Sequence, residues 1–417
     1  MRFLCRSVFL LLAVSLCVAG KPVPPVKTAP RINPLDNAFE KGWMLADTNG
    51  DGIADFLSGQ VIVPQSPSAA ENAAAANLAA RLGYGTSGLT LPVVESAPQS
   101  AQTGPKIFVG ATALDSRAAA VLNPLTSLLR PGEGGVFLTN GNLAVIGADA
   151  PGLLAAATDY ASRAPYQWIA PGDTIQSITG RIAKAFSAAK LPFAAQHVGL
   201  TYVSKVLGIH RAILRVSGTT DAAAIRKALA GAPKPVRFAA VKEIVLLVGH
   251  APPITLLNPV PFATPDISKL KAPGPKPLDL GRLYTIQGLL GGSKQMPVPA
   301  SVDSRLYVPA GKPGIAMANL AARIGLETTG ITLPLAYIPT GVSPSHVPAQ
   351  AVVTSDSPLG QQLVRELTAA KNDEGSSFAQ TIFKTGNLPA SSFSAVLPRE
   401  NARAGSNLCG STVLSGL

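Results

Sequence analysis

Charge, aromatic side chains and cysteine are all scarce in this chain of 417 residues. Charged residues make up 14% and aromatic residues 5%, whereas charged residues average roughly 25% in globular proteins. Two of the three cysteines, Cys5 and Cys17, lie within the first twenty residues. Only Cys409 remains beyond them, which excludes an intrachain disulfide there. Hydrophobic residues still account for 47% of the chain, so its stability must come from packing and from any bound ion.

Recognisable catalytic motifs are missing as well. The four histidines lie far apart, and none has the HxH or HExxH spacing that places two metal ligands together. The sequence has no GxSxG or Walker motif. Ser187–Lys190 and Lys384–Gly386 match the SxxK and KTG motifs of penicillin-recognising serine enzymes, but the intervening Ser-x-Asn motif is absent. The sequence therefore favours a non-enzymatic protein without deciding the question.

No stretch after residue 20 reaches the roughly 18 apolar residues of a membrane-spanning helix. The first twenty residues have the pattern of a secretory signal peptide, with Arg2 and Arg6 ahead of the apolar run 8–18 and small residues before Lys21. We expect cleavage before Lys21 and a secreted or periplasmic mature protein without a transmembrane segment.

The most informative pattern that is present is an internal repeat. Residues 76–94 (ANLAARLGYGTSGLTLPVV) and 318–336 (ANLAARIGLETTGITLPLA) are identical at 12 of 19 positions. A strand-like segment ending in Val-Pro precedes each copy, at Pro64 and Pro309. Two copies separated by a long spacer indicate duplicated domains, because a solenoid needs three or more short repeats.

Strand patterns alternate with helix patterns around each copy, which predicts the α/β class. We expect duplicated two-layer or three-layer α/β units with a small α+β domain of ferredoxin-like kind between them. The predicted organisation is a signal peptide (1–20), a Pro-rich linker (21–35), a first repeat (36–178), a basic α+β domain (179–258), a second Pro-rich linker (259–280), a degenerate or truncated second repeat (281–400) and a flexible tail (401–417).

Charge is distributed unevenly along the chain. Residues 181–242 carry 11 basic side chains and one acid, Asp221. Such a segment is either a solvated basic face or a surface for an anionic polymer of the cell envelope. Another exported protein is an alternative partner. Nucleic acid is disfavoured, because few aromatic residues are interleaved with these bases.

One motif predicts a metal site. Residues 47–55 read DTNGDGIAD, with oxygen-bearing side chains at alternate positions and a glycine where a short loop must turn sharply. This loop resembles the DxDxDGxxD calcium loops of thrombospondin type 3 and FG-GAP repeats, and the start of an EF-hand. It departs from the EF-hand at the twelfth position, where Ser58 replaces the bidentate glutamate. The resemblance implies a weak Ca²⁺ site with ligands Asp47, Asn49, Asp51, Asp55 and the carbonyl of Ile53.

These observations leave two functional hypotheses. The first is an exported, non-enzymatic binding or scaffold protein of the cell envelope, stabilised by Ca²⁺ at residues 47–55. The second is the ancillary amino-terminal region of a secreted hydrolase, either a metallopeptidase or a carbohydrate-active enzyme.

Overall fold

The computed structural model describes residues 33–97, 104–162, 175–204, 206–218, 221–230, 241–257, 284–286, 288–293, 296–302, 304–338, 350–354, 393–398 and 412–415. The predicted signal peptide, the second Pro-rich linker and Cys409 lie outside these residues, as does most of the first linker. The motif Lys384–Gly386 lies outside them too. Among the described residues, no helix combines the length and the apolar character needed to cross a bilayer.

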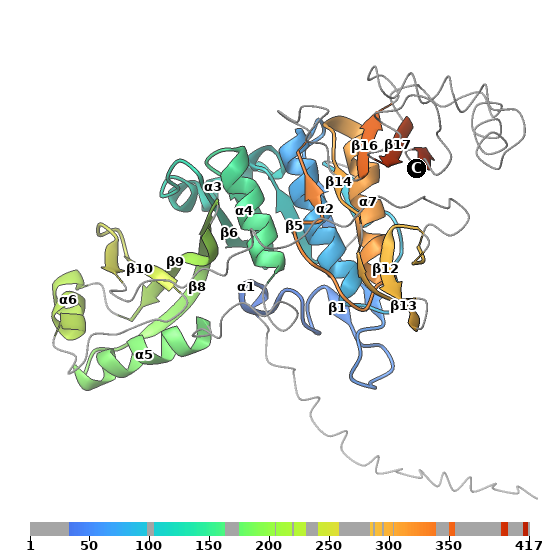
Figure 1. Cartoon of the computed structure of the whole chain (residues 1–417). Coiled ribbons are helices and arrows are strands. Elements are labelled where there is room, and N and C mark those ends of the chain that lie inside the picture. The colour runs from blue at the N-terminus through green and yellow to red at the C-terminus, as the bar shows by residue number, and fades with distance from the viewer. Residues whose placement is uncertain are drawn as a thin grey trace, which may run out of the picture. The chain divides into compact units, whose positions relative to one another are not determined.

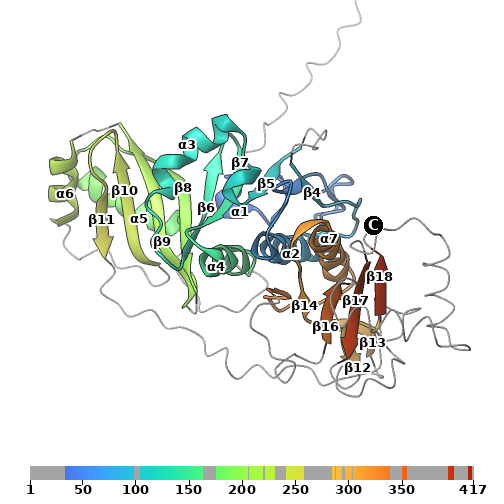
Figure 2. The ribbon, with the colours of Figure 1, turned by 90° about the horizontal axis from the view of Figure 1, so that it is seen from above.

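A nine-stranded mixed sheet forms the centre of the fold (Figures 1 and 2). In spatial order its strands are β11 (Ile254–Leu257), β10 (Val241–Val248), β9 (Val206–Ser217), β8 (Ala194–Val203), β6 (Glu133–Thr139), β7 (Asn142–Gly147), β5 (Lys106–Val109), β3 (Gln60–Val63) and β4 (Val94–Ser96). Strands β7, β5, β3 and β4 run parallel to one another, and β9 runs parallel to β10. The α/β class expected from the sequence is confirmed.

The basic segment extends the sheet of the first repeat. Its strands β8 to β11 join through β6, which pairs antiparallel with β8 in the register Val136 to Leu200. The sequence suggested a separate α+β domain at residues 179–258, but the two segments share one sheet. The physical reason is that β6 pairs with β7 on one side only, and its other edge would otherwise expose unpaired backbone groups.

Seven α-helices occur in the described parts of the chain. They are α1 (Pro34–Asn37), α2 (Ala69–Tyr84), α3 (Ser116–Thr126), α4 (Ala150–Ala161), α5 (Ile175–Ala188), α6 (Ala222–Ala230) and α7 (Gly311–Leu326), and a 3-10 turn spans Ala111–Ala113. Residues of α2, α4, α5 and α6 share a core with one face of the sheet. Helix α3 packs on the opposite face through Leu122 and Leu125.

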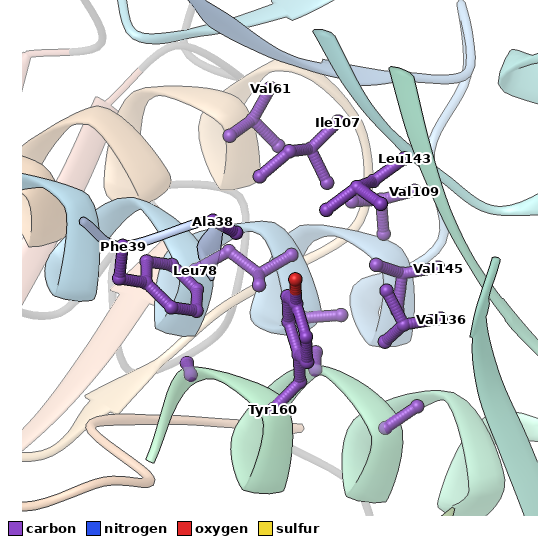
Figure 3. Close-up of a cluster of buried hydrophobic side chains, with 14 of the residues drawn as sticks. Ala38, Phe39, Val61, Leu78, Ile107, Val109, Val136, Leu143, Val145 and Tyr160 are labelled. Atoms are coloured by element: carbon purple, nitrogen blue, oxygen red, sulfur yellow. The ribbon is translucent and has the colours of Figure 1, made fainter. Parts of the chain in front are cut away.

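The main core lies between the parallel strands and helices α2 and α4 (Figure 3). Val61, Ile107 and Val145 point from the strands toward Leu78 of α2 and Tyr160 of α4. Each of these side chains is fully buried, and burial of one such side chain stabilises the fold by roughly 1.5–3 kcal/mol. The Tyr160 hydroxyl donates to the backbone carbonyls of Pro34 and Leu35, which ties the start of the described chain to this core.

Helix α2 is buried on every side, from Ala70 to Gly83 with one partly buried exception. Its sequence is rich in alanine, the best helix former, whose small side chain also allows close packing. Ser68 and Glu71 form a capping box, with the Ser68 N–H 2.8 Å from Glu71 Oε2. The helix ends at Tyr84, and the N–H of Gly85 then donates to the carbonyl of Leu82.

Four smaller sheets complete the described fold. They are β1 (Leu45–Ala46) with β2 (Phe56–Leu57), β12 (Leu290–Ser293) with β13 (Met296–Val302), β14 (Leu306–Tyr307) with β15 (Ala336–Tyr337), and β16 (Gln350–Thr354) with β17 (Phe393–Pro398) and β18 (Thr412–Ser415). The pair β14–β15 is parallel, as is β3–β4 of the first repeat.

The two repeat segments form the same elements in the same order. A strand, a sixteen-residue helix and a second strand parallel to the first occur in each: β3, α2 and β4, then β14, α7 and β15. The Leu–Pro peptide bond before the last strand is cis in both, at Pro92 and Pro334. Equivalent positions of the repeated sequence therefore have equivalent backbone environments.

Candidate functional site

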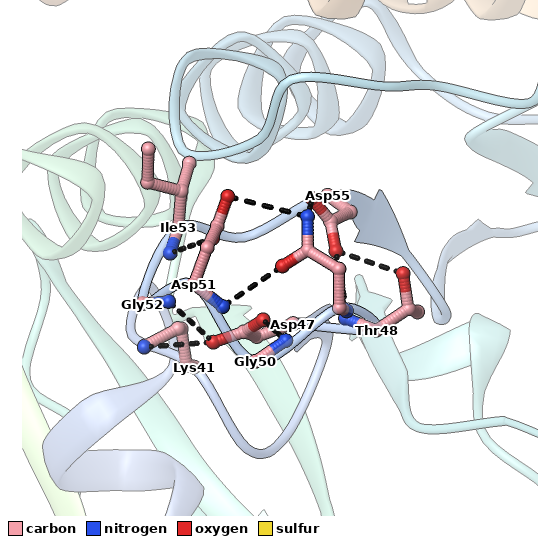
Figure 4. Close-up of polar contacts among 9 residues, drawn as sticks. Lys41, Asp47, Thr48, Gly50, Asp51, Gly52, Ile53 and Asp55 are labelled. Atoms are coloured by element: carbon pink, nitrogen blue, oxygen red, sulfur yellow. Dashed lines mark hydrogen bonds and ion pairs between the residues drawn. The ribbon is translucent and has the colours of Figure 1, made fainter.

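The acidic loop joins the two strands of a short hairpin. Leu45 pairs with Leu57 and Ala46 with Phe56, which leaves residues 47–55 as the loop (Figure 4). The hairpin rests on the end of α2, because the carbonyl of Ala54 accepts hydrogen bonds from Ser87 N–H and the Thr86 hydroxyl.

Asp47 holds the turn of this loop together. One of its carboxylate oxygens accepts the N–H of Gly50 at 2.7 Å, and the other accepts the N–H of Gly52 at 3.0 Å. Both glycines have positive φ, +79° and +96°, a conformation that other residues rarely adopt. The Lys41 ammonium lies 3.1 Å from Asp47 Oδ2, and this hydrogen bond is the main cause that lowers the pKa of Asp47.

Asp55 closes the loop from its other end. Its Oδ2 atom accepts the hydroxyl and the N–H of Thr48, each at 2.7 Å, and the N–H of Asn49 at 3.2 Å. Hydrogen bonds to the ionised form stabilise it, so the Thr48 contacts lower the pKa of Asp55. Both carboxylates are therefore anionic at neutral pH.

The Asn49 amide lies between the remaining acidic oxygens. Its Nδ2 atom is 3.2 Å from Asp51 Oδ2 and 3.3 Å from Asp55 Oδ1. Two carboxylate oxygens thus converge on one positively polarised group. Within the described chain, however, no three His, Cys, Asp or Glu side chains gather as a metal site requires. The aspartates instead accept hydrogen bonds from N–H groups, from the Thr48 hydroxyl and from the Lys41 ammonium.

The second repeat contains a hairpin in the equivalent place. Leu290 pairs with Val302, as Leu45 pairs with Leu57. The carbonyl of Pro299 accepts Thr329 N–H, as that of Ala54 accepts Ser87 N–H. The nine residues 292–300 therefore correspond to 47–55, and they contain no acid and one lysine. Charge and strand pairing both distinguish the two segments, because Ser293 pairs with Met296 inside 292–300, whereas the strands of the first hairpin end at Ala46 and Phe56.

The predicted basic face is only partly available to a partner. Several of the eleven bases are exposed: Lys184, Lys190, Arg215, Arg226, Lys227 and Lys242. Arg211 is buried, with 3% of its surface exposed. Its Nε atom is 2.7 Å from Glu133 Oε1, and Nη2 donates to the Leu128 carbonyl at 2.6 Å.

Arg211 belongs to a buried polar network that the sequence did not indicate. It forms an ion pair with Glu133, which also accepts the Thr201 hydroxyl. Burial opposes ionisation of Glu133, but the hydrogen bonds from Arg211 and Thr201 outweigh it and lower the pKa of the carboxyl. Beside them, Arg130 binds both oxygens of Glu243 at 3.1 and 3.2 Å. The two acids are matched by two guanidinium groups, which favours a structural role.

A second unpredicted feature joins the two repeats. Asn77 of α2 accepts the N–H groups of Leu335 and Ala336 at 2.8 and 2.9 Å, and donates to the Ala336 carbonyl at 3.1 Å. It therefore pairs with the outward side of β15 as a neighbouring strand would.

Asn319, the equivalent residue of α7, makes the reciprocal contact. It accepts the N–H groups of Val93 and Val94 at 2.7 and 2.9 Å, and donates to the Val94 carbonyl at 2.9 Å. Because β4 is the last strand of the nine-stranded sheet, Asn319 satisfies backbone groups that an edge strand would leave open. The identity of the two asparagines is the sequence signal for this pairing.

Equivalent arginines of the two repeats also contact equivalent aromatic rings. The guanidinium carbon of Arg81 lies 4.9 Å from the ring centre of Phe39, and that of Arg323 lies 5.4 Å from the ring centre of Tyr284. Each arginine is in the last turn of its repeat helix.

Comparison of the chain with protein-family models, with curated proteins and with solved structures finds no match.

Proposed function

We propose that this protein is an exported, non-enzymatic scaffold of the cell envelope, built from a duplicated α/β unit and stabilised by Ca²⁺ at the loop 47–55 of the first repeat. The observation that supports the ion is the contrast between two corresponding hairpins. Residues 47–55 form a loop with three aspartates, Asp47, Asp51 and Asp55, whereas the corresponding residues 292–300 contain no acid and include the paired strand residues Ser293 and Met296.

The donor set suits a hard cation. Carboxylate, amide and backbone carbonyl oxygens are the ligands that Ca²⁺ prefers. Asp47, Asn49, Asp51 and Asp55, with the carbonyl of Ile53, would hold the ion. Asn49 would then present its carbonyl oxygen in place of its amide nitrogen, and Lys41 would give up Asp47. Competition from Lys41 and the absence of a bidentate glutamate at Ser58 both favour weak binding.

Calorimetric titration of the mature protein with CaCl₂ tests this site. We expect one site with a Kd of roughly 10⁻⁴–10⁻³ M, the range of extracellular calcium modules. Asp51→Ala should abolish the heat of binding, because it removes one of the ligands. The Asp51 carboxylate accepts hydrogen bonds from Asn49 and Ile53 within the same loop, so the substitution should leave the rest of the fold intact. Lys41→Ala should tighten binding several-fold by freeing Asp47.

The control variant is Glu40→Ala, which removes an exposed acid next to the loop's hairpin. It should leave the titration unchanged. A wild-type protein that gives no heat up to millimolar Ca²⁺, or an Asp51→Ala variant that binds as wild type does, would remove calcium from the proposed function.

A further inference from the structure

The interface between the two repeats is built from equivalent residues on both sides. Helices α2 and α7 lie side by side (Figures 1 and 2). A side chain at Gly83 would collide with the backbone of Ala322, and one at Gly325 would collide with that of Ala80. Glycine at these positions lets the two helix backbones approach closely. Together with Asn77 and Asn319, these contacts relate the two halves by a local two-fold axis.

One pair of equivalent positions breaks this symmetry. Asn72 donates to the carbonyls of Pro309 and Gly311, both at 2.9 Å. Its counterpart is Gly314, where any side chain would collide with Asn72 and with Pro309. A first repeat facing another first repeat would place two asparagines at this point. Two second repeats would lack the asparagine altogether, so the interface selects one repeat of each kind.

The second repeat is structurally separable from the large sheet. Among the described strands, those after residue 284 form their own two- and three-stranded sheets and add none to the nine-stranded sheet. The 26 residues 258–283 connect the two parts, and a chain of that length can span at most roughly 90 Å. Separation of the second repeat would therefore break the interface but no strand pairing of the nine-stranded sheet.

We propose that the first-repeat face formed by α2 and the edge of β4 is an interaction surface for the second repeat of another copy of this chain. Exchange of second repeats between chains would preserve every contact described above. Reciprocal exchange gives a closed dimer. Successive exchange gives a head-to-tail chain, since each molecule carries one face of each kind. This inference rests on the scaffold part of the proposed function and uses no residue of the acidic loop.

A complementation experiment with the full mature chain tests the proposal. The first variant, Asn77→Ala with Gly83→Val, damages only the first-repeat face. The second variant, Asn319→Ala with Gly325→Val, damages only the second-repeat face. In a solution of either variant alone, every interface between a first-repeat face and a second-repeat face contains one damaged face. In the mixture, the intact second-repeat face of the first variant can bind the intact first-repeat face of the second variant. An undamaged interface can therefore form only between unlike chains.

The two variants carry different affinity tags and are mixed in equal amounts, then separated by size with light scattering and by tag capture. We expect mixed dimers at least tenfold more abundant than dimers of either variant alone. A mixture that remains two separate monomeric populations would overturn the proposal. If a double variant does not fold by circular dichroism, Asn77→Ala and Asn319→Ala alone serve the same test, since each removes three hydrogen bonds to the other repeat. Calcium is left out of the buffer, so failure here leaves the calcium titration unaffected.

Discussion

Replacement of Arg211 by methionine should lower the free energy of unfolding by about 3–5 kcal/mol, the usual result of removing one partner of a buried ion pair. The loss is large because Glu133 is 1% exposed and would remain charged with only Thr201 and a backbone N–H as donors. Urea unfolding at pH 7 measures the difference. Since the native pKa of Glu133 is lowered, its contribution is present at neutral pH and is lost as the pH falls through that native pKa.

Two further variants define the interpretation of this experiment. Arg226→Met removes an exposed base from the same segment and should change stability by less than about 0.5 kcal/mol. The double variant Arg211→Met with Glu133→Leu should recover most of the loss, because apolar side chains of similar volume often replace a buried ion pair without cost. A loss below about 1 kcal/mol for Arg211→Met alone would show that the pair is not buried as described.

Replacement of Asp159 by asparagine should stabilise the protein at pH 8 by up to about 4 kcal/mol and have little effect near pH 4. Asp159 is 6% exposed on α4, and burial raises its pKa to about 7, opposed only partly by the N–H of Gly208. In the unfolded chain the carboxyl ionises near pH 4. Wild-type stability should therefore fall as the pH rises from about 4 to about 7 and level off above that.

Urea unfolding of both proteins at a series of pH values tests this expectation. The asparagine retains an oxygen that accepts the Gly208 N–H, so the difference between the two proteins isolates the buried charge. Glu40→Gln, at an exposed acid, provides the control and should give a small difference at every pH. A constant difference between Asp159→Asn and wild type from pH 4 to pH 8 would contradict the raised pKa.

Local features of the fold could be predicted from the sequence because they depend on neighbouring residues. The capping box of Ser68 and Glu71 and the hairpin at Asn140-Gly141 each follow from a short motif, Ser-x-x-Glu and Asn-Gly. Asn140 and Gly141 have the positive φ values that such a turn requires. Asp149 caps α4 through the N–H of Gly152, and aspartate is among the residues that most often cap a helix in this way.

The features that could not be predicted depend on strand register and long-range pairing. Glu133 and Arg211 meet only because β6, β8 and β9 are neighbours in one sheet, and nothing local to either residue indicates this. The same pairing joins the basic segment to the first repeat. The role of Asn77 was hidden for a similar reason, since its partners Leu335 and Ala336 are more than 250 residues away.

The structure of the acidic loop could be predicted only in part. Its ligand types and glycine positions follow from the nine-residue motif, and the turn around Asp47 has the expected form. The salt bridge to Lys41 and the inward-facing Asn49 amide could not be read from the motif, because both depend on how the hairpin folds back. Calcium at this loop stays a prediction.

Amide hydrogen exchange in Asn77→Ala and Asn319→Ala is the most direct test of the paired-repeat arrangement. Loss of a hydrogen bond worth about 1 kcal/mol changes an opening equilibrium roughly fivefold. In Asn319→Ala, the amides of Val93 and Val94 should therefore exchange at least fivefold faster than in the wild type. In Asn77→Ala, the amides of Leu335 and Ala336 should do the same. Each variant should have a smaller effect on the two amides that its own asparagine does not bind. Unchanged exchange at each variant's own pair of amides would contradict the arrangement.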